Sequence, residues 1–151
     1  MHPWLLHALM LPNLLRHIQY PMKHHEVVAA IIQRDDTFLC LQRGPSKYDY
    51  ISHKYEFPGG KVEAGETREE ALIREIKEEL ALDIQVQKHF MTVEHEYADF
   101  KITMYGFLCQ AGGEELTLHE HIAYQWLTAH QLPALDWAAA DIPFVSKLVA
   151  Q

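Results

Sequence analysis

The stretch GGKVEAGETREEALIREIKEELAL, residues 59–82, decides how this chain folds and what it can bind. Its second half opens at Thr67 and has no Gly or Pro before Leu82, and Thr67 with Glu70 fits a capping box. These features predict a helix of about fourteen residues. Apolar side chains recur along it at helical spacing, at Leu72, Ile76 and Leu80. We therefore expect one face of this helix to pack on a β-sheet.

The same helix carries three acidic side chains on one face. Glu75, Glu78 and Glu79 stand at i, i+3 and i+4, which places them in a sector roughly 100° wide. Like charges this close destabilise a helix by about a few tenths of a kcal/mol per pair. Hard cations such as magnesium or manganese offset that cost because they prefer oxygen ligands. From the helix alone, a merely solvated acidic face is the competing interpretation. The solvent side is expected to carry Arg74, Lys77 and Glu70.

The loop before the helix favours the metal-binding interpretation. Gly59, Gly60 and Gly65 permit a tight backbone there, and Gly59 can expose its carbonyl to a metal. Glu66 precedes Arg74 by eight residues. An ion pair between these two side chains would tie the loop to the helix.

Loop and helix together follow the spacing G-x5-E-x7-R-E-U-x-E-E-x-G-U, in which U is a bulky aliphatic residue. On this pattern the sequence resembles the Nudix family over residues 25 to about 149. The runs EFPGGKVEAGE at 56–66 and ADIPFVSKL at 140–148 are typical of its MutT-like branch. Ala81 stands where the pattern has a glycine that helps to end the helix, but this departure removes no ligand. The matching positions are Gly60, Glu66, Arg74, Glu75, Ile76, Glu78, Glu79 and Leu82.

The resemblance implies a fold and a catalytic metal site. The fold would be α/β (α+β), a Nudix-type α/β/α sandwich with a mixed β-sheet flanked by helices. The metal would be Mg2+, with Mn2+ as the alternative, and Glu75 or Glu78 would act as general base on a water whose pKa the metal lowers. Arg74 and Glu66 would complete the catalytic set. The ligands carried over are the Gly59 carbonyl, Glu75, Glu78, Glu79 and Glu120, the last lying six residues before Trp126.

The resemblance also assigns residues to the substrate. Arg43 matches a basic residue that contacts the phosphates, and Lys61 is given the same role, with a solvated lysine as the alternative. Glu56 is placed near the metal site or as a support for it. Asp141 falls where MutT-like enzymes present a polar side chain to the base. As an ionised acceptor it would read the N–H edge of a guanine-type base or the amine of a cytosine. A plain helix N-cap is the competing role.

These parts imply metal-dependent hydrolysis of a nucleoside triphosphate to its monophosphate and pyrophosphate. The first candidate substrate is 8-oxo-dGTP, as in MutT-like sanitation of the nucleotide pool, and the second is CTP, dCTP or 5-methyl-dCTP. Two interpretations from other classes compete, namely a sensor that binds a nucleotide derivative without turnover and a structural interaction module. The intact carboxylates and the loop–helix spacing disfavour both.

Outside the motif, hydrophobic patterning predicts strands and one further helix. Residues 27–32 form a continuous apolar run typical of a buried strand, and Asp35-Asp36 marks the turn to its hairpin partner. The predicted elements are strands at 25–33, 38–42, 55–58, 84–97, 100–109 and 123–127, a loop at 44–54 and a helix at 141–148. Strands interleaved with two helices predict a mixed α/β layered domain.

The composition fits one globular domain in a chain of 151 residues. We assign residues 22–151 to that domain and residues 1–21 to an N-terminal extension that catalysis does not require. The net charge of −8 argues against docking on a polymeric nucleic acid. It permits a small anionic nucleotide delivered with metal cations, because those cations reverse the local field.

The remaining residue types predict location and assembly. Cys40 and Cys109 lie in apolar runs and are predicted to be buried thiols of a reducing, cytoplasmic environment. No apolar run is long enough to span a membrane, and a monomer or a homodimer is expected. Surface or strand positions, rather than metal ligation, are predicted for the paired histidines His24, His25, His119 and His121.

Overall fold

A computed structural model describes residues 21–151 of the chain. Residues 1–20 of the predicted extension lie outside this range, so the extension stays a prediction. The core of the sheet is the apolar run at 27–32, which lies in β1 (Lys23–Arg34). Its side chains point alternately to the two faces of the sheet, and both faces are covered. The predicted buried strand is therefore confirmed, and it extends slightly beyond its predicted bounds.

The mixed sheet has the strand order β3-β2-β1-β6-β5. β1 runs parallel to β6 along one edge, while β2 and β4 both pair antiparallel with its other edge. β5 and β6 form the predicted long hairpin, and β7 pairs with β2. The bounds of the other strands are β2 (Thr37–Gln42), β3 (Tyr55–Glu56), β4 (Gly59–Lys61), β5 (Ile84–Glu96), β6 (Phe100–Ala111) and β7 (Ala123–Thr128).

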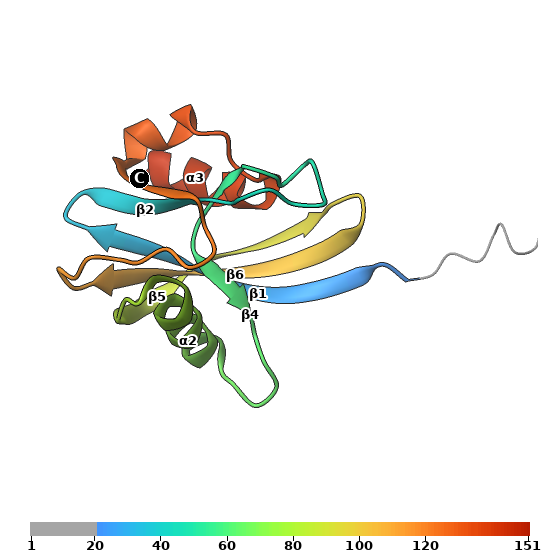
Figure 1. The fold of residues 1–151 in the computed structure, drawn as a ribbon, viewed down its shortest axis with the longest axis horizontal. Coiled ribbons are helices and arrows are strands. Elements are labelled where there is room, and N and C mark those ends of the chain that lie inside the picture. Colours follow the sequence, from blue (N-terminus) through green and yellow to red (C-terminus); the bar gives the residue numbers. More distant parts are fainter. Residues whose placement is uncertain (1–20) are drawn as a thin grey trace, which may run out of the picture.

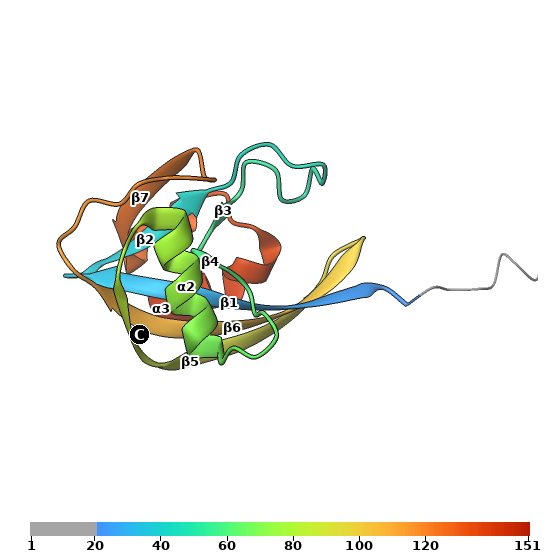
Figure 2. The ribbon, with the colours of Figure 1, turned by 60° about the horizontal axis from the view of Figure 1, so that its bottom comes forward.

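Helices lie on both faces of the sheet (Figure 1). On one face lies α2 (Arg68–Leu80), and on the other lies α3 (Ile142–Val149). Two short 3-10 helices that the sequence did not predict, η1 (Ala129–Ala134) and η2 (Ala139–Asp141), lead into α3. Figure 2 shows α2 crossing in front of the strands. The predicted α/β/α sandwich with a mixed sheet is confirmed.

The motif helix forms as its sequence predicts. The Thr67 hydroxyl accepts from the Glu70 backbone N–H at 3.1 Å, and the Glu70 carboxylate accepts from the Thr67 N–H at 3.3 Å. This capping box satisfies two N–H groups that have no partner within the helix. The apolar sector is buried against the sheet and contains Ala71, Leu72, Ile76 and Leu80. Ala81 ends the helix in the left-handed region, at φ 55° and ψ 30°.

The glycine pair before the helix was predicted as part of a tight loop, and that prediction is wrong. Gly59 and Gly60 are extended in β4, where they pair with Ala29 and Val28 of β1. A Cβ atom on Gly59 would lie 1.9 Å from the Val28 carbonyl oxygen. Glycine is therefore required by the close approach of two backbones rather than by a turn.

Candidate active site

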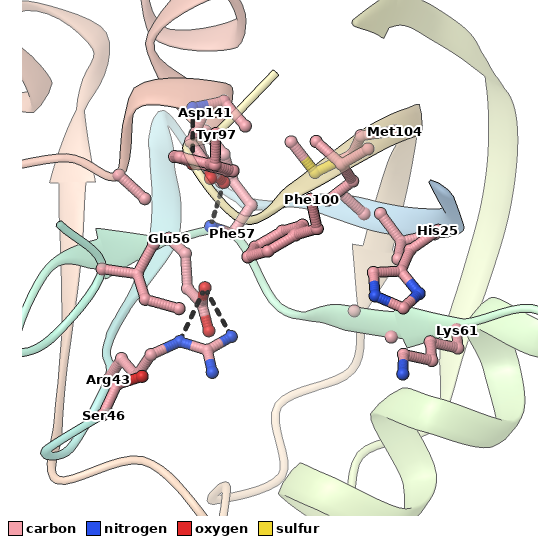
Figure 3. A pocket seen from close by; sticks show the side chains of 18 of the residues that line it. His25, Arg43, Ser46, Glu56, Phe57, Lys61, Tyr97, Phe100, Met104 and Asp141 are labelled. Carbon is pink, nitrogen blue, oxygen red and sulfur yellow. Dashed lines mark hydrogen bonds and ion pairs between the residues drawn. The ribbon is translucent and has the colours of Figure 1, made fainter. Parts of the chain in front are cut away.

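A cavity of about 450 Å³ opens between β1, the β3–β4 segment, the 44–54 loop and η2. One wall is apolar and aromatic, formed by Phe57, Tyr97, Phe100, Ile102 and Met104. Polar side chains stand around it at His25, Arg43, Glu56, Lys61, Glu79 and Asp141. In Figure 3, Arg43 with Glu56 and Lys61 with His25 lie on two sides of the cavity, and Asp141 lies beside Tyr97, above Glu56 in this view. The arrangement suits a ligand with an anionic part and a flat, partly polar part.

Next to this cavity, Arg74 connects the loop to the acidic face of α2. Its Nε and Nη2 donate to the two carboxylate oxygens of Glu66, each at 2.7 Å. Its Nη1 donates to Glu75 at 2.9 Å and to Glu78 at 3.3 Å. The hydrogen bonds from Arg74 to Glu66 hold the pKa of Glu66 down at about 2. The predicted ion pair is confirmed, whereas the expected solvation of Arg74 is wrong because five acceptor oxygens, including the Lys61 carbonyl, surround its guanidinium.

Glu79 is the motif carboxylate in the most unfavourable environment for a charge. Burial, followed by the nearby carboxylates of Glu120, Glu75 and Glu56, raises its pKa to about 8. Within residues 21–151, its buried Oε2 atom has no hydrogen-bond partner. A buried carboxylate oxygen without a partner, with other carboxylates nearby, is stabilised by a counter-charge.

The chemistry of this cluster fits a divalent cation, because hard cations prefer several carboxylate oxygens. In the described part of the chain, no three acidic or histidine side chains are already drawn together as a metal site. Glu75 and Glu78 instead face Arg74, and the Glu78 side chain is largely exposed. Glu75 and Glu120 nevertheless both lie near enough to Glu79 to raise its pKa, although the three side chains form no ligand set among residues 21–151.

A missing side chain makes room for one of these carboxylates. A Cβ atom on Gly60 would lie 2.3 Å from the carboxyl carbon of Glu75. Gly60 therefore lets Glu75 lie directly against β4. Gly59, the predicted carbonyl ligand, lines the cavity one position earlier.

Arg43 and Glu56 form an ion pair at the polar side of the cavity. Arg43 donates from Nη2 at 3.1 Å and from Nε at 3.3 Å to Glu56 Oε2. The other carboxylate oxygen of Glu56 bonds to His121 Nε2 at 2.8 Å. Lys61 is exposed and lines the same cavity, while its backbone carbonyl accepts from Arg74. Glu56 lies close enough to Glu79 to raise its pKa, and its role as a support for a metal site stays a prediction.

Asp141 differs from its prediction in two ways. It is only 4% exposed, and burial, with Glu56 nearby, raises its pKa well above the ordinary value. This environment disfavours the charged form, whereas an ionised acceptor was predicted. Asp141 directly precedes α3, but its side chain makes no capping hydrogen bond to that helix. Its Oδ1 accepts from the Phe57 backbone N–H at 2.9 Å instead.

Sequence reasoning missed two polar side chains of this site. His121 was expected at the surface or in a strand, but its side chain is 8% exposed and contacts Glu56. Tyr97 forms the aromatic wall, and its hydroxyl accepts from the Ala140 N–H at 3.0 Å. The signal for His121 was its position beside Glu120, since one loop delivers both residues. For Tyr97 the signal was the aromatic residues on either side of the hairpin turn at Asp99.

The NUDIX domain model matches residues 23–148. The chain belongs to the Nudix hydrolase family, in its MutT-like branch.

Characterised relatives span nearly the same length. The chain is 36% identical to the CTP pyrophosphohydrolase of Escherichia coli K12, with 85% of this chain and 94% of that protein covered. It is 32% identical to the 8-oxo-dGTP diphosphatase of the same organism, with 84% and 98% covered. The solution structure of the E. coli ORF135 protein superposes with a TM-score of 0.72 at 35% identity, covering 85% of this chain and 91% of that one. Across residues 21–151, neither helix has the length and apolar character to cross a membrane.

Proposed function

We propose that this protein hydrolyses a nucleoside triphosphate to the monophosphate and pyrophosphate in a reaction that requires Mg2+, with Mn2+ as a substitute. One observation carries the proposal. The Glu79 carboxylate, whose buried Oε2 has no hydrogen-bond partner within residues 21–151, lies beside a cavity lined by the cationic side chains of Arg43 and Lys61 and by the buried Asp141. The two relatives named above each act on a nucleoside triphosphate or its oxidised form, as their names state.

The phosphates would lie between the carboxylate cluster and the basic side chains. Arg43 would donate to phosphate oxygens with the guanidinium N–H groups that Glu56 does not use. Lys61 would add a point charge from the other side of the cavity. A divalent cation held by Glu75, Glu78, Glu79, Glu120 and the Gly59 carbonyl would supply charge neutralisation and Lewis-acid activation.

The remaining chemistry belongs to the protein. Glu75 or Glu78 would take a proton from the attacking water. Arg74 donates to both of these carboxylates and is itself fixed by Glu66. Arg74 would therefore hold whichever glutamate acts as base in a defined orientation. Because water attacks the phosphorus directly, the reaction would form no covalent intermediate with the protein.

Base recognition would fall to Asp141 in its neutral form. A protonated carboxyl group offers one donor and one acceptor. It can therefore accept from a ring N–H and donate to a carbonyl oxygen of an oxidised guanine. It can equally accept from the amine of cytosine and donate to the unprotonated ring nitrogen. We keep 8-oxo-dGTP as the first candidate. The 36% identity to a CTP pyrophosphohydrolase favours CTP and its deoxy and methylated forms as the second.

A substrate panel tests this proposal. We would measure kcat/KM with Mg2+ for dGTP, 8-oxo-dGTP, CTP, dCTP, 5-methyl-dCTP and several nucleoside diphosphate sugars. A preference of at least about tenfold for one triphosphate would name the base, since tenfold corresponds to 1.4 kcal/mol of discrimination. Turnover of the diphosphate sugars alone would overturn the proposal.

Asp141→Asn and Asp141→Ala separate the two protonation states. Asparagine keeps one donor and one acceptor, so we expect this variant to retain the preferred substrate. Alanine keeps neither and should lose the preference. Loss of the preference in both variants would indicate an ionised Asp141.

Location and assembly belong to the same proposal. Cys40 and Cys109 are buried and free, as predicted, and burial raises the pKa of each thiol to about 12. We propose a cytoplasmic protein that acts as a monomer or a homodimer on a small nucleotide, without docking on polymeric nucleic acid.

A further inference from the structure

The loop between β6 and β7 carries two consecutive side chains that approach different residues of the cavity wall. Glu120 approaches Glu79 in the carboxylate cluster. His121 contacts the Glu56 carboxylate instead. The loop is anchored at both ends by backbone hydrogen bonds. The Thr117 N–H donates to the Leu80 carbonyl at 2.9 Å, and the Ile122 N–H donates to Gln42, the residue before Arg43, at 3.0 Å.

The three linked side chains differ in exposure. His121 is 8% exposed, Glu56 is 18% exposed and Arg43 is 45% exposed. The histidine is therefore the most firmly packed member and the arginine the least. In such a hydrogen-bonded network the packed histidine restrains the carboxylate, and the carboxylate in turn restrains the exposed guanidinium.

Each oxygen of the Glu56 carboxylate has its own donor. His121 Nε2 bonds to Oε1 at 2.8 Å, and Arg43 donates twice to Oε2. An ionised carboxylate only accepts, so Nε2 carries the proton that it shares. The hydrogen bond to Oε1 restrains the carboxylate plane and keeps Oε2 facing Arg43.

We infer that His121 is a positioning residue that fixes the Glu56 carboxylate and thereby aims the Arg43 guanidinium at the substrate phosphates. The identity of the ligand as a phosphate rests on the proposed function, whereas the contacts among His121, Glu56 and Arg43 do not depend on turnover. His121 would touch neither substrate nor metal. Its removal should therefore weaken substrate binding more than it slows the chemical step.

Three variants test this role. His121→Phe keeps a ring of similar size but removes the donor. His121→Gln is the rescue variant, because its side-chain amide can place a donor near the position of Nε2. His119→Phe is the matched control, since His119 is exposed and stands two residues away in the same loop.

In kinetics with the preferred triphosphate, we expect His121→Phe to raise KM by about tenfold, the size of one hydrogen bond to a charged group. Its kcat should change by less than about threefold. His121→Gln and His119→Phe should stay close to the wild-type KM. Glu56→Gln should also raise KM, and the double variant His121→Phe with Glu56→Gln should be no worse than Glu56→Gln alone. If the KM increases of His121→Phe and Glu56→Gln multiplied in the double variant, the inference would be overturned. An unchanged KM in His121→Phe would overturn it as well.

A second readout works without any substrate. The Arg43 Nε–H resonance, assigned by its loss in Arg43→Lys, should move toward the position of solvated arginines in His121→Phe and return in His121→Gln. An unmoved resonance would overturn the positioning role. If the wild type turned over no nucleotide while the resonance moved as expected, the proposed function would fail and the role of His121 would stand.

Discussion

Arg74 and Glu66 are joined by two hydrogen bonds of 2.7 Å each, one to either oxygen of the carboxylate. Glu66 lies in the loop before α2 and Arg74 lies within the helix, so the pair fixes one element against the other. The third nitrogen of the guanidinium is left to contact Glu75 and Glu78. One side chain thus sets both the loop geometry and the orientation of two motif glutamates.

Arg74→Lys should lower kcat/KM by about tenfold or more, because an ammonium group cannot reproduce a bidentate contact together with the contacts to Glu75 and Glu78. Steady-state kinetics with the preferred triphosphate measures this. Lys77→Gln is the control, since Lys77 is exposed on the same helix and, within residues 21–151, its ion pair is with the exposed Asp83. Equal activity of Arg74→Lys and the wild type would show that the pair has no catalytic importance.

The adjacent glycines should respond differently to alanine. In Gly60→Ala the new Cβ meets the flexible end of Glu75, which can move aside at little cost to stability. We therefore expect a stable protein with most of its activity lost. In Gly59→Ala the Cβ meets the Val28 backbone at 1.9 Å, so the β1–β4 pairing should be destabilised by about 1–3 kcal/mol or more. Thermal unfolding and activity assays, run in parallel, separate the two outcomes. The reverse pattern would contradict the placement of Glu75.

Ala81→Gly should stabilise the protein. Ala81 adopts φ 55°, a left-handed conformation that costs a side-chain-bearing residue about 1–2 kcal/mol. Glycine removes that cost but is more flexible in the unfolded chain, so the net gain should be about 1 kcal/mol, or about 2–4 °C in Tm. Calorimetry measures the shift, and activity should not change. A lower Tm would mean that the alanine side chain contributes packing that outweighs the strain.

Asp141 should make stability fall as pH rises. Burial and the charge of Glu56 raise the pKa of Asp141 above its ordinary value of 3.8, while Arg43 opposes the shift. The folded protein therefore keeps a proton that the unfolded chain releases. This contribution is complete below the unfolded pKa and is lost as pH rises through the folded pKa. Asp141→Asn has no such proton. The unfolding free energy of each protein would be measured in urea between about pH 5 and pH 8. The difference, variant minus wild type, should increase with pH. A constant difference would mean that Asp141 is already ionised throughout.

Patterns of local origin could be predicted from the sequence. The capping box at Thr67, the buried sector of α2 and the ion pair of Glu66 with Arg74 all depend on spacing within one segment. The same holds for the long hairpin of β5 and β6, because period and turn residues specify it.

Features that depend on contacts distant in sequence could not be predicted. Gly59 and Gly60 were assigned to a tight loop because a sequence does not reveal that β1 lies beside them. Asp141 was expected to be ionised because its burial against Phe57, 84 positions away, is set only by the folded chain. His121 was missed for the same reason, as its partner Glu56 lies 65 positions away. The carboxylate cluster was foreseen only because the motif concentrates most of it on one helix.

The most direct measurement follows pyrophosphate and phosphate separately as the protein consumes a nucleoside triphosphate. The reactions would contain Mg2+ or EDTA, and Glu78→Gln would serve as the control variant. We predict one pyrophosphate for each nucleotide consumed with Mg2+, no turnover with EDTA, and a large loss in Glu78→Gln. Release of single phosphates, or tight nucleotide binding with no turnover in Mg2+, would contradict the assignment of this site as a nucleoside triphosphate pyrophosphohydrolase.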